Sequence, residues 1–251
     1  MTHPVRLENA AGASSAVIVC EHASHFIPPE YDCLGLDCEA ALSHAAWDPG
    51  ALGVTRRLAE VLDAATLTGT ISRLVYDLNR PPGAHDATPL KSEQIAVPGN
   101  VGLTDADRAR RVSDVYVPFQ EALKTQLAKT KNPVLITVHS FTPIYHGQPR
   151  AVEIGVLHDA DTRLADAMLA ISDKHTSLNV QRNSPYGPEH GVTHTLREHA
   201  IRDGRPNVML EIRNDLIKTD TQQVHFADMI AAWAAEAFEA IGIEGDLRCK
   251  A

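Results

Sequence analysis

Four short stretches of the chain combine side chains that a hydrolytic metal site needs. They comprise Glu21-His22 with His25, residues 73–80, His139-Ser140, and Glu211 with Arg213. A hydrolytic zinc site typically takes three nitrogen or oxygen ligands from the protein and leaves a fourth position for water. A nearby carboxylate can act as general base, and an arginine can hold a substrate carboxylate through two hydrogen bonds. By residue type, the sequence contains each of these groups.

Glu211 is the candidate that a purely structural role explains least well, because it interrupts an apolar run. A buried carboxylate costs free energy unless it is paired or bound to a ligand. The other candidates also have ordinary interpretations. Asp48 is a good helix cap, and His22 and His25 could be surface histidines beside an extended loop. The sequence therefore indicates a catalytic metal site only if these side chains lie close together in the folded chain.

Apolar runs rich in β-branched residues predict the strands that position these groups. The runs comprise residues 16–20, 66–71, 134–138, 151–158, 178–181 and 207–212. Helices are expected, from apolar spacing and from start and stop signals, over residues 37–44, 48–62, 104–129, 161–175, 191–203 and 221–241. Strands that alternate with helices predict an α/β domain with a mostly parallel sheet. In such sheets, ligands bind outside the carboxyl ends of the strands.

Local signals refine this pattern at three places. Asp48 is expected to cap a helix that has Pro49 at its first position. The helix over 104–129 should bend near Pro118. Residues 84–102 are rich in proline, glycine and polar side chains, which predicts a long surface loop that helps to shape the site.

Length and composition limit the possible functions. The 251 residues suit a single domain over 1–251, and the net charge of −9 argues against a nucleic-acid partner. Four cysteines without a C-x-x-C pair suit reduced thiols in the cytosol. No signal peptide and no membrane-spanning run is found. We therefore expect a cytoplasmic protein that acts on a small molecule, without nucleic-acid or membrane partners.

Taken together, the motifs resemble the N-formylglutamate amidohydrolase family, which in turn is similar to zinc carboxypeptidases. The resemblance rests on Glu21-His22-Ala23-Ser24 with Ile27-Pro28, Trp47-Asp48-Pro49-Gly50-Ala51, Ser72-Arg73, Asp77-Leu78-Asn79-Arg80-Pro81, His139-Ser140-Phe141 and Glu211-Ile212-Arg213-Asn214-Asp215-Leu216. The D-x-N-R-P and E-I-R-x-D-L pieces are the most specific. The resemblance implies a single α/β domain of the zinc-carboxypeptidase-like (phosphorylase/hydrolase-like) fold, with a mixed, mostly parallel sheet flanked by helices.

The resemblance also implies a role for each candidate residue. His22 and His139 would bind one zinc ion, and Glu211 would be the catalytic general base and acid. The group that binds the substrate carboxylate would comprise Arg73, Asn79 and Arg80.

The third metal ligand is not fixed by the motifs. Zinc carboxypeptidases have H-x-x-E at the first strand end, whereas this chain has His22-x-x-His25. We choose Asp48, because the amidohydrolase family also places an aspartate in this region. His25 is the alternative, and Glu21 is a more remote one.

The reaction implied by the resemblance is the hydrolysis of N-formyl-L-glutamate to formate and L-glutamate, a step of histidine breakdown. One alternative is a hydrolase of another N-acyl amino acid or of a small peptide. Another is a non-catalytic relative that binds a metal or a carboxylate. The presence of Glu211 together with two candidate histidine ligands argues against that second alternative.

Overall fold

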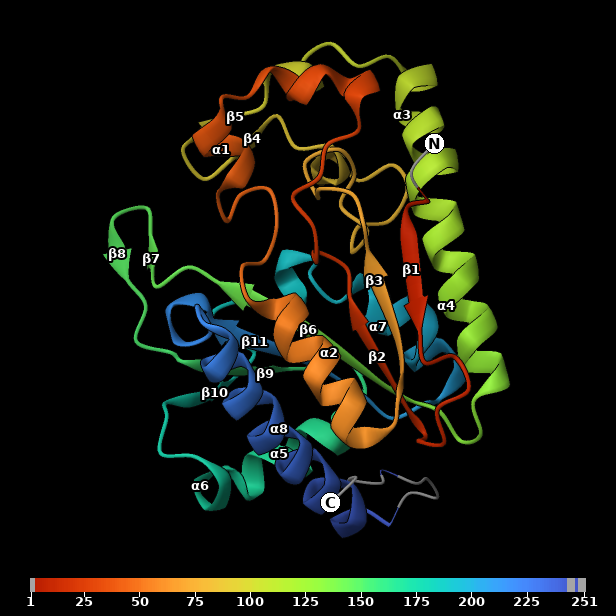
Figure 1. The fold of residues 1–251 in the computed structure, drawn as a ribbon, viewed down its shortest axis with the longest axis vertical. Helices are drawn as coiled ribbons and strands as arrows, with labels where there is room; N and C mark the ends of the chain where they lie inside the picture. The colour runs from red at the N-terminus through yellow and green to blue at the C-terminus, as the bar shows by residue number, and fades with distance from the viewer. Residues whose placement is uncertain (1–2, 243–246, 248–251) are drawn as a thin grey trace.

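A seven-stranded sheet forms the centre of the protein in a computed structural model that describes residues 3–242 and 247 (Figure 1). The strand order is β1-β3-β2-β6-β11-β9-β10. The strands are β1 (Val5–Glu8), β2 (Ala16–Cys20), β3 (Ala65–Gly69), β6 (Val134–Phe141), β9 (Ile154–Leu157), β10 (Val180–Arg182) and β11 (Asn207–Arg213). β1 is antiparallel to β3, and β9 is antiparallel to β11, while the other neighbouring strands are parallel. The predicted mixed, mostly parallel sheet is therefore confirmed.

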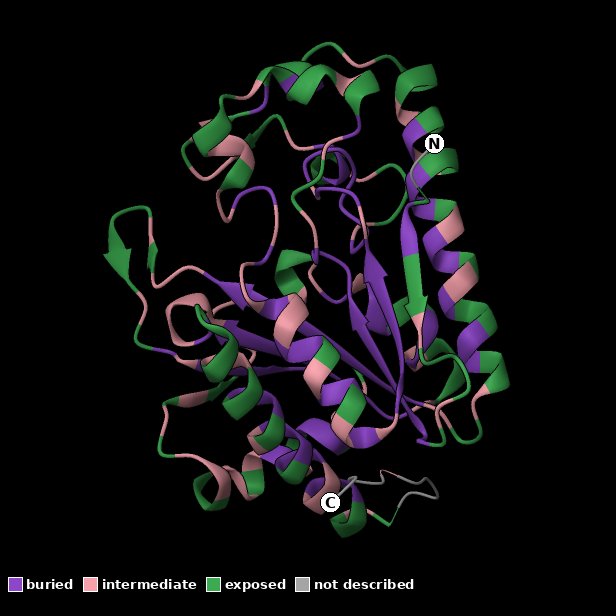
Figure 2. Ribbon diagram, viewed as in Figure 1, coloured by how far each residue is buried: buried purple, intermediate pink, exposed green. Residues whose placement is uncertain are grey.

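Helices cover both faces of this sheet. They are α1 (Cys38–Leu42), α2 (Ala51–Leu62), α3 (Asp105–Arg111), α4 (Val117–Lys129), α5 (Arg163–Ala170), α6 (Ser172–His175), α7 (His194–His199) and α8 (Asp220–Ala240). Successive strand residues point to opposite faces, so Ile136 and Val138 pack with α2, α5 and α8, whereas Leu135 packs with α4 and α7. Figure 2 shows the inner strands buried, while the edge strand β1 and the outer faces of the helices are largely exposed. Within the described residues, no helix has the length and apolarity to span a bilayer.

The central strand β6 is longer than its apolar run predicts. It continues through His139 and Ser140 to Phe141, and all eight of its residues are buried. In the parallel pair β6–β11, His139 lies opposite Glu211. Strand pairing explains the extra length, because the hydrogen bonds to β11 keep the backbone extended beyond the point where the apolar run ends. The two candidate residues are thus held by strands and not by loops.

The predicted helix cap at Asp48 is wrong. Helix α2 begins at Ala51, and its N-cap is Gly50, which has a left-handed backbone with φ of 83°. The Asp48 carboxylate instead contacts His139 and Ser140. A capping role is therefore not what places an aspartate at this position.

Other element boundaries differ from the prediction for local reasons. The expected helix over 104–129 does begin with a cap at Thr104, but a π-helical turn, Val112–Tyr116, separates α3 from α4 just before Pro118. The helix over 161–175 divides into α5 and α6, and the helix over 191–203 shortens to α7 followed by a 3-10 turn. Residues 84–102 contain a small hairpin, β4 (Lys91–Ser92) with β5 (Ile95–Ala96). A second hairpin, β7 (Ile144–Tyr145) with β8 (Gln148–Pro149), follows β6.

Candidate metal and substrate site

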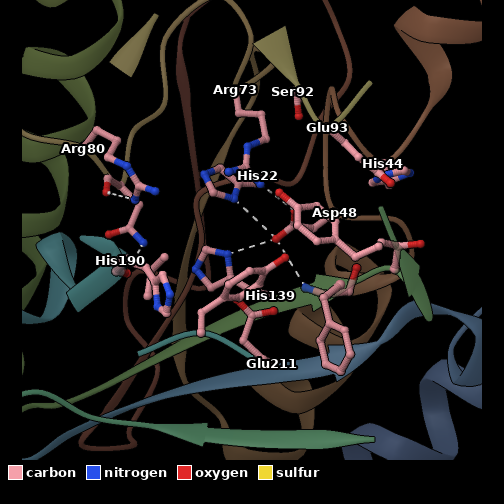
Figure 3. Close-up of a pocket in the computed structure, with 17 residues that line it drawn as sticks. His22, His44, Asp48, Arg73, Arg80, Ser92, Glu93, His139, His190 and Glu211 are labelled. Carbon is pink, nitrogen blue, oxygen red and sulfur yellow. Dashed lines mark hydrogen bonds and ion pairs between the residues drawn. The ribbon is translucent and has the colours of Figure 1, made fainter. Parts of the chain in front are cut away.

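His22, Asp48 and His139 form a buried group that we call the metal cluster. One ligand atom from each residue lies within 4.8 Å of the other two. His22 follows β2, His139 lies on the parallel neighbour β6, and Asp48 precedes α2. The structure thus brings together the three residues that the sequence proposed as ligands (Figure 3).

Short local contacts hold Asp48 against the two strands. The Asp48 backbone N–H donates to the His22 carbonyl at 2.9 Å, and the Ser140 hydroxyl donates to the Pro49 carbonyl at 2.8 Å. The Ser140 backbone N–H lies 3.3 Å from Asp48 Oδ2. Ser140 therefore positions the aspartate segment beside β6.

Both imidazoles turn the same nitrogen toward the Asp48 carboxylate. Asp48 Oδ2 lies 3.4 Å from His22 Nδ1 and 2.9 Å from His139 Nδ1. The opposite nitrogens face other carboxylates, with His22 Nε2 2.7 Å from Asp77 Oδ1 and His139 Nε2 3.0 Å from Glu21 Oε2. A histidine that binds a metal usually contacts a carboxylate or carbonyl through its second nitrogen. This arrangement fits a metal bound by two Nδ1 atoms and one carboxylate oxygen.

Unpaired polar atoms around the cluster support the same conclusion. The buried atoms without a hydrogen-bond partner in the described part of the chain include Glu21 Oε1, His22 Nδ1 and Glu211 Oε2. Buried polar groups are normally satisfied, so such a concentration calls for an explanation. Three buried carboxylates, Glu21, Asp77 and Glu211, lie around the cluster, and Asp48 within it is a fourth. A divalent cation would offset their charge. The donor set of two nitrogens and an oxygen suits zinc.

The two other ligand alternatives do not join the cluster. His25 is exposed and packs its ring edge against Trp47, with ring centroids 5.1 Å apart. Glu21 lies behind His139, on its Nε2 side. Among the alternatives for the third ligand, the geometry therefore favours Asp48.

Glu211 faces the same cavity from β11 and is only 6% exposed. Burial, reinforced by the negative charge of Asp48, raises the pKa of Glu211 to about 7. A general base works best when its pKa lies near the operating pH. At Asp48, burial opposes ionisation, yet the charge of His22 and the hydrogen bond with His139 hold the pKa well below its usual range. Neighbouring carboxylates with such different pKa values suit different roles, one as ligand and one as proton acceptor.

The two arginines of the predicted carboxylate-binding group differ in their partners. Arg73 pairs with Asp48 at 3.4 Å and with Asp77 at 3.1 Å. Arg80 pairs through Nε with Asp86 and donates from Nη1 to the Gly191 carbonyl at 3.0 Å. Its Nη2 has no hydrogen-bond partner among the residues described, and Arg80 lines the cavity. Arg80 thus has a free donor for a ligand.

Asn79 lines the cavity but uses its side-chain amide elsewhere. Its Nδ2 donates to the Val192 carbonyl, and its Oδ1 accepts from the Thr195 backbone N–H at 2.9 Å. These bonds tie the Arg80 segment to the start of α7 and to the loop before it. The role of Asn79 toward a substrate stays a prediction, as do the roles of the other site residues.

Several cavity residues have no counterpart among the sequence candidates. The cavity has a volume of about 280 Å³. Its further lining residues include His44, Ser92, Glu93, Tyr145, Tyr186 and His190. Ser92 and Glu93 come from residues 84–102, so the expectation that this segment shapes the site is met. Asp77 belongs to the D-x-N-R-P motif, which was the one sequence signal for its contact with His22.

Comparisons with known proteins agree with the motifs. The chain is 50% identical to the gene product Atu2144 from Agrobacterium tumefaciens, whose crystal structure it matches with a TM-score of 0.94 over 96% of this chain and 97% of that chain. It shares its fold with the N-formylglutamate amidohydrolase from Ralstonia eutropha JMP134, at 19% identity and a TM-score of 0.52, over 96% of this chain and 98% of that one. Among curated proteins, none matches. Residues 14–218 match the model of the N-formylglutamate amidohydrolase family, and the chain therefore belongs to that family.

Proposed function

We propose that the protein is a zinc-dependent amidohydrolase that cleaves the acyl amide of an N-acyl amino acid. N-Formyl-L-glutamate is the first substrate to test, with formate and L-glutamate as products. The observation that carries this proposal is the convergence of the metal cluster, Glu211 and Arg80 on one cavity. Family membership supports the same reaction class. With this substrate, the protein would serve histidine breakdown in the cytoplasm.

The metal cluster would hold one zinc ion through His22, Asp48 and His139. A zinc ion bound there would polarise the amide carbonyl and lower the pKa of a water molecule to about 7. Asp77 and Glu21, on the outer nitrogens of the two histidines, would keep the inner Nδ1 atoms free to bind the metal.

Glu211 would transfer the proton during hydrolysis. It takes a proton from the attacking water as the oxygen bonds to the acyl carbon, and it returns that proton to the nitrogen as the C–N bond breaks. In the net reaction, water adds OH to the acyl group and H to the amine nitrogen. The unpaired Glu211 Oε2 is the oxygen available for this transfer.

Arg80 would anchor the substrate carboxylate through its free Nη2. Arg73 is largely committed to Asp48 and Asp77, so it would chiefly hold those carboxylates in place and present its positive charge to the cavity. A substrate anchored at Arg80 would place its amide beside the metal cluster and Glu211 (Figure 3).

The first test combines a metal assay with a rate measurement. We expect one zinc per chain in the active protein, and we expect Glu211→Gln to keep the metal while losing at least ~10²-fold in kcat on N-formyl-L-glutamate. Glu239→Gln, an exposed change on α8, is the matched control and should keep the full rate. Absence of bound metal together with an undiminished rate in Glu211→Gln would exclude the proposed mechanism.

A further inference from the structure

The cavity extends on both sides of the metal cluster. In Figure 3, Arg80 and His190 lie on one side of the cluster, and His44, Ser92 and Glu93 lie on the other. The Arg80 side already has a use in the proposed function, because it would hold the substrate carboxylate. The opposite side has no use in the cleavage of a formyl group.

The shape of an amide determines which part of the substrate lies next to His44, Ser92 and Glu93. This inference rests on the proposed function. A secondary amide is planar and trans, so the substituent on the acyl carbon and the amino-acid Cα lie at opposite ends of the C–N bond. A substrate whose carboxylate is held at Arg80 would therefore direct its acyl substituent away from Arg80, toward the side of the cluster where Figure 3 shows His44, Ser92 and Glu93. In a formyl group this substituent is a single hydrogen atom, which reaches none of these residues.

Hydrogen bonds hold together the residues that line the cavity on that side. The Glu93 carboxylate accepts from His44 Nε2 and from the His146 backbone N–H, each at 2.9 Å. Gln94 Nε2 lies 2.9 Å from His146 Nδ1. One glutamate thus joins three segments far apart in sequence: the segment before α2, the β4–β5 hairpin and the β7–β8 hairpin.

This wall also offers unused hydrogen-bonding capacity to a ligand. The Ser92 hydroxyl lines the cavity and makes no hydrogen bond within the described residues. A carboxylate has about four acceptor sites, so Glu93 can accept from a further donor in addition to His44 and His146. Tyr145 also lines the cavity, and it belongs to the β7–β8 hairpin whose His146 contacts Glu93. A short acyl group with a polar or cationic end would use these groups, whereas an aliphatic one would leave them unpaired.

The geometry points to an acyl-side subsite, comprising Ser92 and Glu93 with Tyr145, that accepts acyl groups longer than formyl and favours an aminoacyl group. The substrate class would then be N-aminoacyl amino acids with a free carboxylate, in other words short peptides, in addition to formylated amino acids. The chemistry at the amide is unchanged, since water adds across the same C–N bond.

The test compares three substrates on the zinc-loaded protein: N-formyl-L-glutamate, N-propionyl-L-glutamate and glycyl-L-glutamate. Propionyl and glycyl groups have the same number of non-hydrogen atoms, so their comparison isolates the amine. We expect kcat/KM for glycyl-L-glutamate to equal or exceed that for the formyl substrate and to exceed that for the propionyl substrate at least tenfold. Ser92→Ala and Glu93→Gln should each lower the ratio of glycyl to formyl kcat/KM, Glu93→Gln at least tenfold. Glu121→Gln, exposed on α4, is the matched control and should leave this ratio unchanged.

The outcomes separate this inference from the proposed function. Cleavage of N-formyl-L-glutamate with at least 100-fold lower kcat/KM for both longer substrates would overturn the acyl-side subsite and leave the proposed function standing. An unchanged ratio in both Ser92→Ala and Glu93→Gln, with folding confirmed by circular dichroism, would also overturn it. Cleavage of none of the three substrates would overturn the proposed function and this inference together.

Discussion

Glu21 is a buried carboxylate that contacts a candidate metal ligand from outside the metal cluster. Its carboxylate is 1% exposed and pairs through Oε2 with His139 Nε2 at 3.0 Å. Burial of a charged carboxylate costs free energy unless a neighbouring group pairs with it. Its position suggests that it orients His139 and increases the basicity of Nδ1, as carboxylates do for histidines that bind metals.

We therefore predict that Glu21→Gln weakens zinc binding by 10- to 100-fold, the usual effect of removing such a partner. Competition with a chromophoric chelator measures the affinity without reference to activity. The thermal unfolding of the metal-free variant separates this effect from a folding defect. Zinc affinity equal to that of the wild type would show that Glu21 does not support His139.

Arg80 provides the residue-scale test of substrate binding. A hydrogen bond to a charged group contributes about 1.5–3 kcal/mol, and each 1.4 kcal/mol corresponds to tenfold in binding. Arg80→Ala should therefore raise KM for N-formyl-L-glutamate by about 10- to 100-fold with a smaller change in kcat. Asp86→Asn removes the surface partner of Arg80 and should have little effect. An unchanged KM in Arg80→Ala would rule out this assignment.

The sequence identified the candidate metal ligands and the candidate general base, but not the other residues that line the cavity. Glu211 could be singled out because it interrupts an apolar run, whereas the ligand roles of His22 and His139 were implied by the resemblance to the family. His44, Glu93 and His146 gave no such signal, since their association depends on which hairpins meet in the folded chain. Asp48 was found as a candidate, yet its local pattern predicted a helix cap that the structure does not form.

At the scale of elements, the start of α2 controls the position of Asp48. Gly50 has φ of 83°, and a Cβ added there would lie 2.4 Å from the Ile217 carbonyl oxygen. Both the left-handed backbone and the close backbone contact exclude a side chain. The turn between Asp48 and α2 thus depends on glycine.

We predict that Gly50→Ala lowers the free energy of unfolding by more than about 1 kcal/mol and also weakens zinc binding, because relief of the clash displaces Asp48. Gly83→Ala is a matched control, since Gly83 also has positive φ, at 89°, but no atom lies within 4 Å of the added Cβ. Urea unfolding and zinc titration of both variants measure the two effects. Equal behaviour of the two variants in both assays would contradict the role given to Gly50.

Element boundaries were predictable where the sequence carries its own stop signals, and unpredictable where packing decides. The cap at Thr104 and the extent of α8 follow local chemistry, whereas β6 extends past its apolar run because β11 pairs with it. The strand β1 escaped prediction, since its pattern is short and half exposed and it is stabilised by pairing with β3.

At the scale of the whole molecule, alternating strands and helices predicted the sheet class and the side on which the site lies. The antiparallel neighbours β1 and β9 were not predictable, because no local pattern encodes the direction in which a strand joins its partner. The layered arrangement buries polar residues as well as apolar ones. One of them, His199 on α7, contacts Gln120 on α4 between the helices that cover one face of the sheet.

Burial of His199 makes the stability of the whole fold sensitive to acid. Burial lowers the pKa of His199 to about 4, compared with about 6.5 in an unfolded chain. Between these values the unfolded chain binds the extra proton, so stability is complete above the unfolded pKa and falls as the pH falls toward the folded one. For this group alone, the loss between pH 7 and pH 5 is about 2 kcal/mol.

The variant His199→Asn cannot titrate, so its stability should fall less over the same pH range. We expect the difference in the free energy of unfolding between wild type and His199→Asn to change by about 2 kcal/mol from pH 7 to pH 5, measured by urea unfolding. His225→Asn, an exposed change on α8, should follow the wild type at both pH values. The comparison cancels the titration of the site residues, which all three proteins share. If the two histidine variants show the same pH dependence as the wild type, the proton is not excluded from His199 in the folded protein.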